Sequence, residues 1–336
     1  MKIIFNHKYE DLISIDNLLS AWQEFIRGKR NKKDVQVFSR YLMDNILSLH
    51  NDLKSRTYKH GGYECFKIND PKSRTIHKAS VRDRLLHHAV YRILYPFFDK
   101  TFIPNSFSCR DNKGAHKAIK ELIGYASIVS KNNTRVCWIL KCDIRKFFAS
   151  IDQNILINIL EQYIQDKDTV NLLKEVIFSF KPNGLPLGNL TSQLFANVYL
   201  NEFDQFIKHK LKIKHYIRYA DDFVILSENK DYLKTILEPI SNFLQNELKL
   251  ILHPDKIFIE TLSSGVDFLG WVNFFDHRIV RKTTKLRAFR NIGKGNSDYA
   301  TISSYFGLLK HGNTHKVKEN ILDRICRFIL DIISCL

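Results

Sequence analysis

The stretch that decides the fold is Ile217-Arg-Tyr-Ala-Asp-Asp-Phe-Val-Ile-Leu226, in which two short β-rich runs flank a pair of aspartates. Aromatic and β-branched residues favour strands on both sides, and only Ala220, Asp221 and Asp222 separate them. The pattern predicts a tight hairpin with the two acids at its tip. Aspartate is also frequent in ordinary β-turns, so this stretch alone does not identify a functional site.

A third aspartate ends another apolar run, Val136-Cys-Trp-Ile-Leu-Lys-Cys-Asp143, which suits a buried strand. A buried carboxylate without a partner is costly, so acids at strand ends must be exposed, paired or bound to a metal. Converging carboxylates suit two Mg²⁺ ions about 3.5–4 Å apart, an arrangement that serves phosphoryl transfer. We therefore expect Asp143, Asp221 and Asp222 to form one metal site.

The charge of the 336-residue chain is strongly positive and unevenly placed. Lys and Arg number 52 against 35 Asp and Glu, which gives a formal net charge of +17. Residues 51–150 carry 20 basic and 8 acidic side chains, residues 151–250 carry 11 and 13, and residues 251–336 carry 13 and 8. A near-neutral middle between two basic regions favours a nucleic-acid partner. A generally basic, solvated surface is the alternative.

The remaining patterns predict an α+β fold. Helices are expected over 11–55, 81–95, 153–165, 168–180, 191–212 and 231–249, and Pro96 should stop the second of them. Strands are expected over 63–68 and 74–78, which form a hairpin, and over 256–261 and 266–274, before a basic helical tail.

The sequence also bears on the compartment of the protein. The six cysteines are scattered without metal-binding spacing, which suits reduced thiols. The N-terminus lacks the apolar segment of a signal peptide, and no stretch reaches the about 18 apolar residues that a membrane span needs. We expect a soluble, cytoplasmic protein.

Two motifs resemble those of a known family. Tyr219-Ala-Asp-Asp222 resembles the YxDD box of reverse transcriptases, and Lys141-Cys-Asp-Ile-Arg-Lys-Phe-Phe148 resembles the acidic palm motif that precedes it. The resemblance covers about residues 60–320 and implies an RNA-directed DNA polymerase shaped like a right hand. It implies N-terminal helices and fingers over 1–135, a palm of antiparallel sheet and helices with interleaved fingers elements over 136–277, and a helical thumb over 278–336.

The resemblance also assigns roles to single residues. Two Mg²⁺ ions would be held by Asp143, Asp221, Asp222 and the backbone carbonyl of Ile144, and Lys256 would protonate the departing pyrophosphate. The residues that would contact the incoming deoxynucleoside triphosphate are Lys67, Arg74, Ile144, Phe148, Leu187, Gly188 and Gln193.

Phe148 falls where these enzymes place an aromatic ring that excludes the ribose 2′-OH, which argues for DNA rather than RNA synthesis. Lys67 and Arg74 are similar to the pair that clamps the triphosphate, but Lys72 and Lys78 lie close by and leave the assignment open.

Further segments resemble parts that contact nucleic acid. Phe268-Leu-Gly-Trp271 resembles the primer-grip hairpin, and Phe107-Ser-Cys-Arg110 resembles part of the fingers motif that tracks the template. Residues 278–294 hold seven basic side chains and no acid, which suits either a thumb that contacts phosphates or a solvated helix.

The segment Leu185-Pro-Leu-Gly-Asn-Leu-Thr-Ser-Gln193 indicates the type of enzyme. Most reverse transcriptases have Gln where this chain has Leu187, and the Leu variant resembles the enzymes of diversity-generating retroelements, which misincorporate opposite adenine. Losing one hydrogen bond of about 0.5–1.5 kcal/mol changes discrimination only a few- to tenfold, so Leu187 contributes to low fidelity without explaining all of it.

Ala220 departs from that subfamily, which usually has Met, and leaves open a phage-defence or retron-type enzyme that copies a dedicated noncoding RNA. A non-catalytic RNA-binding scaffold is a further alternative, which the intact motif residues disfavour. The implied partners are template RNA, nascent DNA, deoxynucleotides and a small basic accessory variability protein that forms a pentamer. The apolar run 328–336 suits either docking of that partner or closure of a thumb core.

Overall fold

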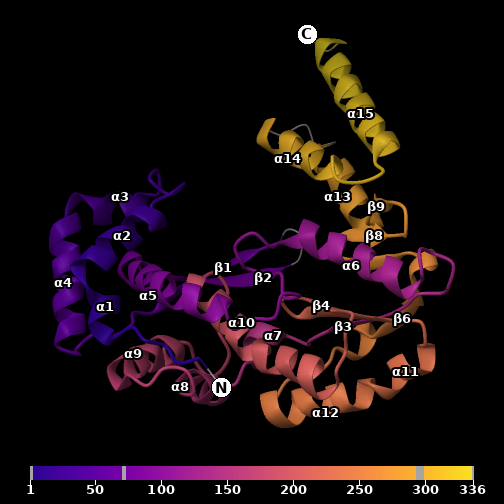
Figure 1. The fold of residues 1–336 in the computed structure, drawn as a ribbon. Coiled ribbons are helices and arrows are strands. Elements are labelled where there is room, and N and C mark those ends of the chain that lie inside the picture. Colours follow the sequence, from indigo (N-terminus) through magenta and orange to yellow (C-terminus); the bar gives the residue numbers. More distant parts are fainter. Residues whose placement is uncertain (1–2, 70–72, 293–298, 335–336) are drawn as a thin grey trace. The chain divides into compact units, whose positions relative to one another are not determined.

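The computed structural model describes residues 3–69, 73–292 and 299–334, with side chains through residue 326. The fold is α+β, as the sequence predicted (Figure 1). The strands form a two-stranded sheet β1-β2, a four-stranded sheet in the order β4-β5-β3-β6, and a three-stranded sheet β7-β8-β9. Their bounds are β1 Tyr63–Ile68, β2 Arg74–Ala79, β3 Trp138–Asp143, β4 Tyr216–Tyr219, β5 Asp222–Ser227, β6 Phe258–Thr261, β7 Val266–Phe268, β8 Trp271–Asn273 and β9 Arg278–Val280.

Most of the described helices lie in the predicted segments, with several breaks, but helix α6 was not predicted. The described α-helices are α1 Tyr9–Ile13, α2 Ile15–Phe25, α3 Lys33–Arg40, α4 Leu42–Lys54, α5 Val81–Asp99, α6 Ala115–Val129, α7 Phe147–Ser150, α8 Gln153–Glu161, α9 Lys167–Phe178, α10 Leu190–Gln205, α11 Lys230–Thr235, α12 Leu237–Leu248, α13 Lys282–Ile292, α14 Tyr299–Leu309 and α15 His315–Ser334. A π-helical turn, Phe206–Lys210, follows α10. None of the described helices is both long and apolar enough to cross a membrane.

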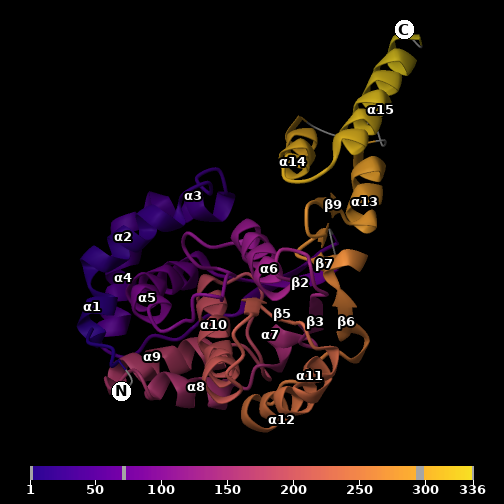
Figure 2. The same cartoon turned by 45° about the vertical axis from the view of Figure 1, so that its right-hand side comes forward.

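The chain divides into two compact units, and the first comprises residues 1–114, 142–223 and 236–257. Its N-terminal helices bury apolar stripes; Leu18, Trp22 and Phe25 of α2, for example, recur at helical spacing and are buried. The helix α5 packs on α2 and on α10 (Figures 1 and 2). The region 11–55, predicted as helical, is thus confirmed as four helices, with Ser14 capping α2 through its side chain.

The predicted stop before Pro96 was wrong, because α5 continues to Asp99. Proline lacks the N–H that an interior helical position needs and normally ends or kinks a helix. Here the last turn buries Phe98, whose ring packs edge-on against Tyr163 at a centroid distance of 5.5 Å. Burial of an aromatic side chain offsets the lost hydrogen bond.

Two other predicted segments are divided. The helix expected over 231–249 is two helices, because Pro239 cannot occupy a helix interior and instead lies in the first turn of α12. The strand expected over 266–274 is the hairpin β7–β8, whose turn residues Leu269 and Gly270 both have positive φ, 53° and 87°. That combination is typical of a two-residue hairpin turn.

The second unit comprises residues 115–141, 224–235 and 258–336. Within it, the start of β3 pairs antiparallel with β6, Trp138 lying opposite Thr261. The sheet β7-β8-β9 has Asn273 opposite both Val266 and Arg278, and α13 packs against α15 (Figure 2). The predicted three-part division into fingers, palm and thumb stays a prediction.

Candidate active site

The hairpin β4–β5 positions the aspartate pair. Strand β4 ends at Tyr219, β5 begins at Asp222, and the turn consists of Ala220 and Asp221. Ala220 has a φ of 54°, a left-handed conformation that is uncommon for a residue with a side chain. Asp221 and Asp222 are half-buried, so the predicted hairpin with acids at its tip is confirmed.

A buried ion pair beneath the turn holds this unusual conformation. Arg218 and Asp204 are both fully buried, and the guanidinium donates two hydrogen bonds to the carboxylate, from Nε at 2.8 Å and from Nη2 at 2.7 Å. Nη1 of Arg218 donates to the carbonyl oxygen of Ala220 at 3.2 Å, and the Tyr216 hydroxyl donates to Asp204 at 2.7 Å. The pair therefore connects α10 to the tip of the hairpin.

Our sequence reasoning missed this ion pair. A signal was present, since Arg218 is a charged residue within an otherwise apolar and aromatic run, and a buried charge requires a partner. Nothing in the sequence pattern identifies Asp204 as that partner, because α10 and β4 meet only in the folded chain.

Asp143 and Lys256, which the sequence analysis named separately, lie together. The Lys256 Nζ is 2.8 Å from Oδ2 of Asp143, whose side chain is 13% exposed. The backbone N–H of His253 donates to the carbonyl oxygen of Asp143 at 2.8 Å, which holds the segment that carries Lys256 beside the end of β3. The ammonium thus neutralises a carboxylate that burial would otherwise destabilise.

Asp221 belongs to the same electrostatic cluster. Burial, and after it the negative charge of Asp143, raise the pKa of Asp221, whereas the charges of Lys256 and Arg74 lower it. The N–H of Ile144 donates to the Asp221 carbonyl oxygen at 3.3 Å, so the backbone after Asp143 lies against the hairpin tip.

The donor chemistry of this cluster fits a hard divalent cation. Carboxylate oxygens are the ligands that Mg²⁺ prefers, and two carboxylates that raise each other's free energy when ionised favour a bound cation. Within the described part of the chain, however, no group of three His, Cys, Asp or Glu side chains is arranged to hold a metal ion. The Lys256 ammonium is paired with Oδ2 of Asp143 in this arrangement. A metal ion bound to that oxygen would therefore require the ion pair to open.

Phe148 lies in the short helix α7, half-buried, with its ring edge-on to Phe147 at 5.3 Å. Its carbonyl oxygen accepts a hydrogen bond from the N–H of Leu185 at 2.7 Å. Its helix is therefore tied to the loop that carries Leu187 and Gly188.

That loop in turn packs against β2. The Leu187 carbonyl oxygen accepts from the N–H of His77 at 2.9 Å. Gly188 has a φ of 117°, and a Cβ there would lie 2.9 Å from Cγ2 of Ile76. Glycine is therefore required both by the backbone conformation and by the close approach of the strand. Gly188 and the exposed Gln193 line a cavity of about 370 Å³.

Lys67 and Arg74 lie on the hairpin β1–β2 but do not share a face. Lys67 is opposite Thr75, and Arg74 is opposite Ile68. Because side chains alternate along a strand, this register directs Lys67 and Arg74 to opposite faces of the ribbon. The positive charge of Arg74 lowers the pKa of Asp221, so Arg74 acts on the carboxylate cluster. Lys72 lies outside the described residues.

The other predicted nucleic-acid contacts have mixed outcomes. Arg110 is largely buried and pairs with Asp99 at 2.6 Å, so its charge supports the fold locally. The hairpin expected around Phe268-Leu-Gly-Trp271 is present. The basic run 278–294 spans β9 and α13, and its residues 293 and 294 lie outside the described residues. The side chains of the apolar run 328–336 also lie outside the described part of the chain.

The chain is similar to known proteins over much of its length. Residues 66–272 match the family described as "Reverse transcriptase (RNA-dependent DNA polymerase)". The chain is 25% identical over 260 residues to Protein YkfC of Escherichia coli, covering 65% of this chain and 66% of that protein. It is 24% identical over 293 residues to the group II intron-encoded protein LtrA of Lactococcus lactis, covering 66% and 47%. These matches span from about half to just under two thirds of the relatives' own length.

Among solved structures, the telomerases of Candida albicans and Candida tropicalis, each in complex with the TWJ fragment of telomeric RNA, resemble this chain. The TM-scores are 0.53 and 0.52, the identities 11% and 14%, and the matches cover 84% and 86% of this chain and 58% and 57% of those chains. At such identities the likeness concerns the fold alone. It confirms the predicted α+β fold of a right-hand polymerase.

Proposed function

The chain belongs to the reverse transcriptase (RNA-dependent DNA polymerase) family, and from this we propose that it copies a template RNA into DNA by nucleotidyl transfer. The observation that carries the proposal is the clustering of Asp143, Asp221 and Lys256. Two segments of the chain supply the carboxylates and a third supplies the ammonium, with a Nζ–Oδ2 distance of 2.8 Å to Asp143. Such clustering has no evident role in stability, because burial of Asp221 disfavours its charged form.

We propose that two Mg²⁺ ions are held by Asp143, Asp221, Asp222 and the carbonyl oxygen of Ile144. When bound, the ions supply charge neutralisation at the phosphates and activation of the primer 3′-oxygen. Lys256 then leaves Asp143 and is available as the proton donor to the pyrophosphate, a role that requires a positioned acid. Arg74 contributes positive charge toward the triphosphate.

Phe148 is proposed to select deoxynucleotides. The hydrogen bond from the N–H of Leu185 to the Phe148 carbonyl oxygen fixes the position of α7 relative to the Leu185 loop. An aromatic ring at this position would collide with a ribose 2′-OH. Lys67, Leu187, Gly188 and Gln193 are proposed to complete the nucleotide site.

For the biological setting, we propose a diversity-generating retroelement, because Leu187 replaces the hydrogen-bonding Gln of most reverse transcriptases. A pentameric basic accessory variability protein is then a proposed partner. A phage-defence or retron-type enzyme copying a dedicated noncoding RNA is the second candidate, and Ala220 favours it. The telomerase relatives were solved with RNA, which supports RNA as a ligand of this chain.

Primer extension tests the activity. The chain is incubated with a primed heteropolymeric RNA, Mg²⁺ and deoxynucleotides beside an Asp222→Ala variant, and the products are sequenced. We expect DNA from the native chain, none from the variant, and equal RNA binding by both. Extension by Asp222→Ala would refute the metal assignment.

The same products distinguish the two settings. Errors concentrated opposite adenine support the retroelement, and we expect Leu187→Gln to reduce them. Accurate DNA, or an error spectrum unchanged in Leu187→Gln, favours the defence or retron enzyme instead.

A further inference from the structure

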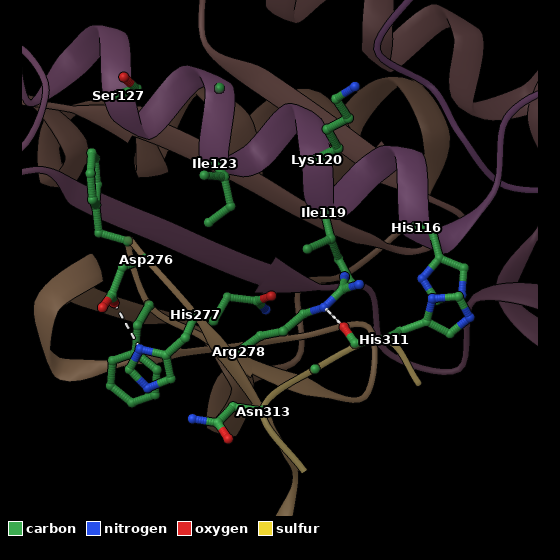
Figure 3. Close-up of a pocket in the computed structure, with 15 residues that line it drawn as sticks. His116, Ile119, Lys120, Ile123, Ser127, Asp276, His277, Arg278, His311 and Asn313 are labelled. Atoms are coloured by element: carbon green, nitrogen blue, oxygen red, sulfur yellow. Dashed lines mark hydrogen bonds and ion pairs between the residues drawn. The ribbon is translucent and has the colours of Figure 1, made fainter. Parts of the chain in front are cut away.

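A cavity of about 810 Å³ lies within the second unit. Helix α6, the β8–β9 turn and the loop between α14 and α15 line it (Figure 3). Its volume falls in the range of about 300–1,000 Å³ that small-molecule and cofactor sites occupy. Its walls come from three segments that are distant in the sequence.

One wall is a face of α6. His116, Lys120, Ile123 and Ser127 recur at helical spacing along it, and Figure 3 shows Ile119 and Ile123 pointing from the helix toward Arg278. Gly124 lies on the same wall, and a Cβ there would meet no described atom within 4 Å. The helix therefore leaves open space where an ordinary side chain would fit.

Aromatic rings and one cation form the opposite wall. The His311 ring of this wall lies 3.9 Å from the ring of His116 on α6, and Phe274 stacks on His277 at 4.6 Å, both distances measured between ring centroids. The Arg278 guanidinium lies over the Trp271 ring and donates through Nε to the carbonyl oxygen of His311. Flat rings and a guanidinium are the groups that stack on nucleobases and contact phosphates.

The acid in this wall is already engaged, because Asp276 pairs with His277 at 2.7 Å. Burial, followed by the charges of His311 and Arg278, lowers the pKa of His116, which keeps that ring neutral at physiological pH. The cavity thus combines apolar and aromatic surface with the positive charge of Arg278.

Asn273 holds the β7–β8 wall of the cavity together. It is fully buried in the wall, and its amide NH₂ donates to the carbonyl oxygens of Val266, Phe268 and Trp271 at 3.2, 3.3 and 3.2 Å. These three bonds fix which end of the amide is oxygen. That oxygen, Oδ1, accepts no hydrogen bond from any described residue, which is unusual for a buried polar atom.

We propose that this cavity binds an unpaired nucleotide, with the base between the apolar face of α6 and the aromatic wall and its phosphate near Arg278. Every nucleotide offers a flat ring and a phosphate, which are the groups that aromatic rings and a guanidinium contact. The nucleotide comes either from a single-stranded end of a bound nucleic acid, a source that rests on the proposed function, or from the free nucleotide pool.

Gly124→Leu tests the proposal by filling the cavity, with Gly124→Ala as the matched control. Both substitutions favour the helix over Gly, so both variants should fold. Fluorescence anisotropy of the full chain, without Mg²⁺ or deoxynucleotides, measures binding of a blunt RNA–DNA hybrid and of hybrids with four-nucleotide tails. We expect a tail to tighten binding about fivefold or more in the native chain and in Gly124→Ala, and this advantage to vanish in Gly124→Leu.

Thermal denaturation in the presence of AMP tests the second source, the free nucleotide pool. A rise in the midpoint for the native chain and Gly124→Ala but not for Gly124→Leu, without any tail effect, supports a site for the free nucleotide. If neither ligand acts, or if Gly124→Leu responds like Gly124→Ala, the proposal is overturned. Because these measurements need no polymerisation, failed primer extension would contradict the proposed function and leave the result for the cavity intact.

Discussion

At the scale of single residues, Asp221 is held in surroundings that oppose its ionisation. Burial is the largest cause of its raised pKa, and the charge of Asp143 adds to it. A carboxyl whose folded pKa lies above the unfolded value makes the fold less stable as pH rises through that folded pKa, because only the protonated form suits the fold. Sites that bind a cation commonly trade stability for function in this way.

We therefore expect Asp221→Asn to raise the free energy of unfolding at pH 7 and to lower primer extension by roughly a hundredfold or more. The gain in stability should shrink as pH falls toward 4, where Asp221 itself becomes protonated. Chemical denaturation between pH 7 and pH 4 measures this, with the exposed Glu247→Gln as control. A gain in the free energy of unfolding that does not change with pH would contradict ionisation of the buried Asp221 carboxyl as its cause.

Phe148 is the residue at which sugar selection is predicted. Phe148→Ala should raise incorporation of ribonucleotides relative to deoxynucleotides by tenfold or more, because the ring no longer meets the 2′-OH. Competitive single-nucleotide extension measures the ratio, and Phe147→Leu, the buried neighbour, serves as control. An unchanged ratio in Phe148→Ala would remove the steric-gate assignment.

At the scale of elements, the β4–β5 hairpin depends on α10. The Arg218–Asp204 pair is wholly buried, and the same guanidinium donates to the carbonyl oxygen of Ala220 in the turn. Removing one member of a buried pair leaves an uncompensated charge, which costs about 3–5 kcal/mol, whereas replacing both by apolar residues is often neutral. Stability and turn geometry can therefore be separated by mutation.

We expect Arg218→Met to destabilise the protein by about 3–5 kcal/mol, and Arg218→Met with Asp204→Leu to recover most of that stability. The double variant should still extend primers poorly, with kcat reduced more than KM, since the Ala220 carbonyl no longer has its donor. Denaturant unfolding and steady-state extension provide the two readouts. Full activity in a stable double variant would show that the pair acts only on stability.

At the scale of the whole molecule, charge is the dominant feature. The chain carries +17, and the basic residues concentrate before and after a near-neutral middle, residues 151–250, that contains Asp221 and Asp222. Basic proteins bind nucleic acids largely through phosphates, with release of counterions. Asp221 and Asp222 thus lie in the least basic part of the sequence, whereas Asp143 lies near the end of the most basic part.

Affinity for an RNA–DNA hybrid should therefore fall steeply with salt. We expect Lys282→Ala with Arg290→Ala, both on α13, to reduce the slope of log K against log salt by about 0.9 for each phosphate that the variant no longer neutralises. Anisotropy titrations at salt concentrations from about 50 to about 300 mM measure the slope. Lys54→Ala on α4 is the control. An unchanged slope would indicate that α13 is a solvated helix.

The sequence by itself determined the local structure of the segments that carry Asp143, Asp221 and Asp222. Two runs rich in aromatic and β-branched residues, separated by a three-residue gap, predicted the hairpin around Asp221, and an apolar run predicted the strand that ends at Asp143. These features depend on neighbours a few residues apart, so a linear pattern contains them. The breaks at Pro239 and Gly270 are also local, but they required recognition of a helix start and a two-residue turn within longer patterns.

Only the tertiary structure decided which distant groups meet. The partner of Arg218, the ion pair of Lys256 with Asp143, the continuation of α5 past Pro96 and the cavity around Asn273 all arise between segments remote in the sequence. Their energies come from packing, burial and the removal of solvent around charges, which exist only once the segments are together. Residue types indicate that such a partner is needed, and the fold determines which residue it is.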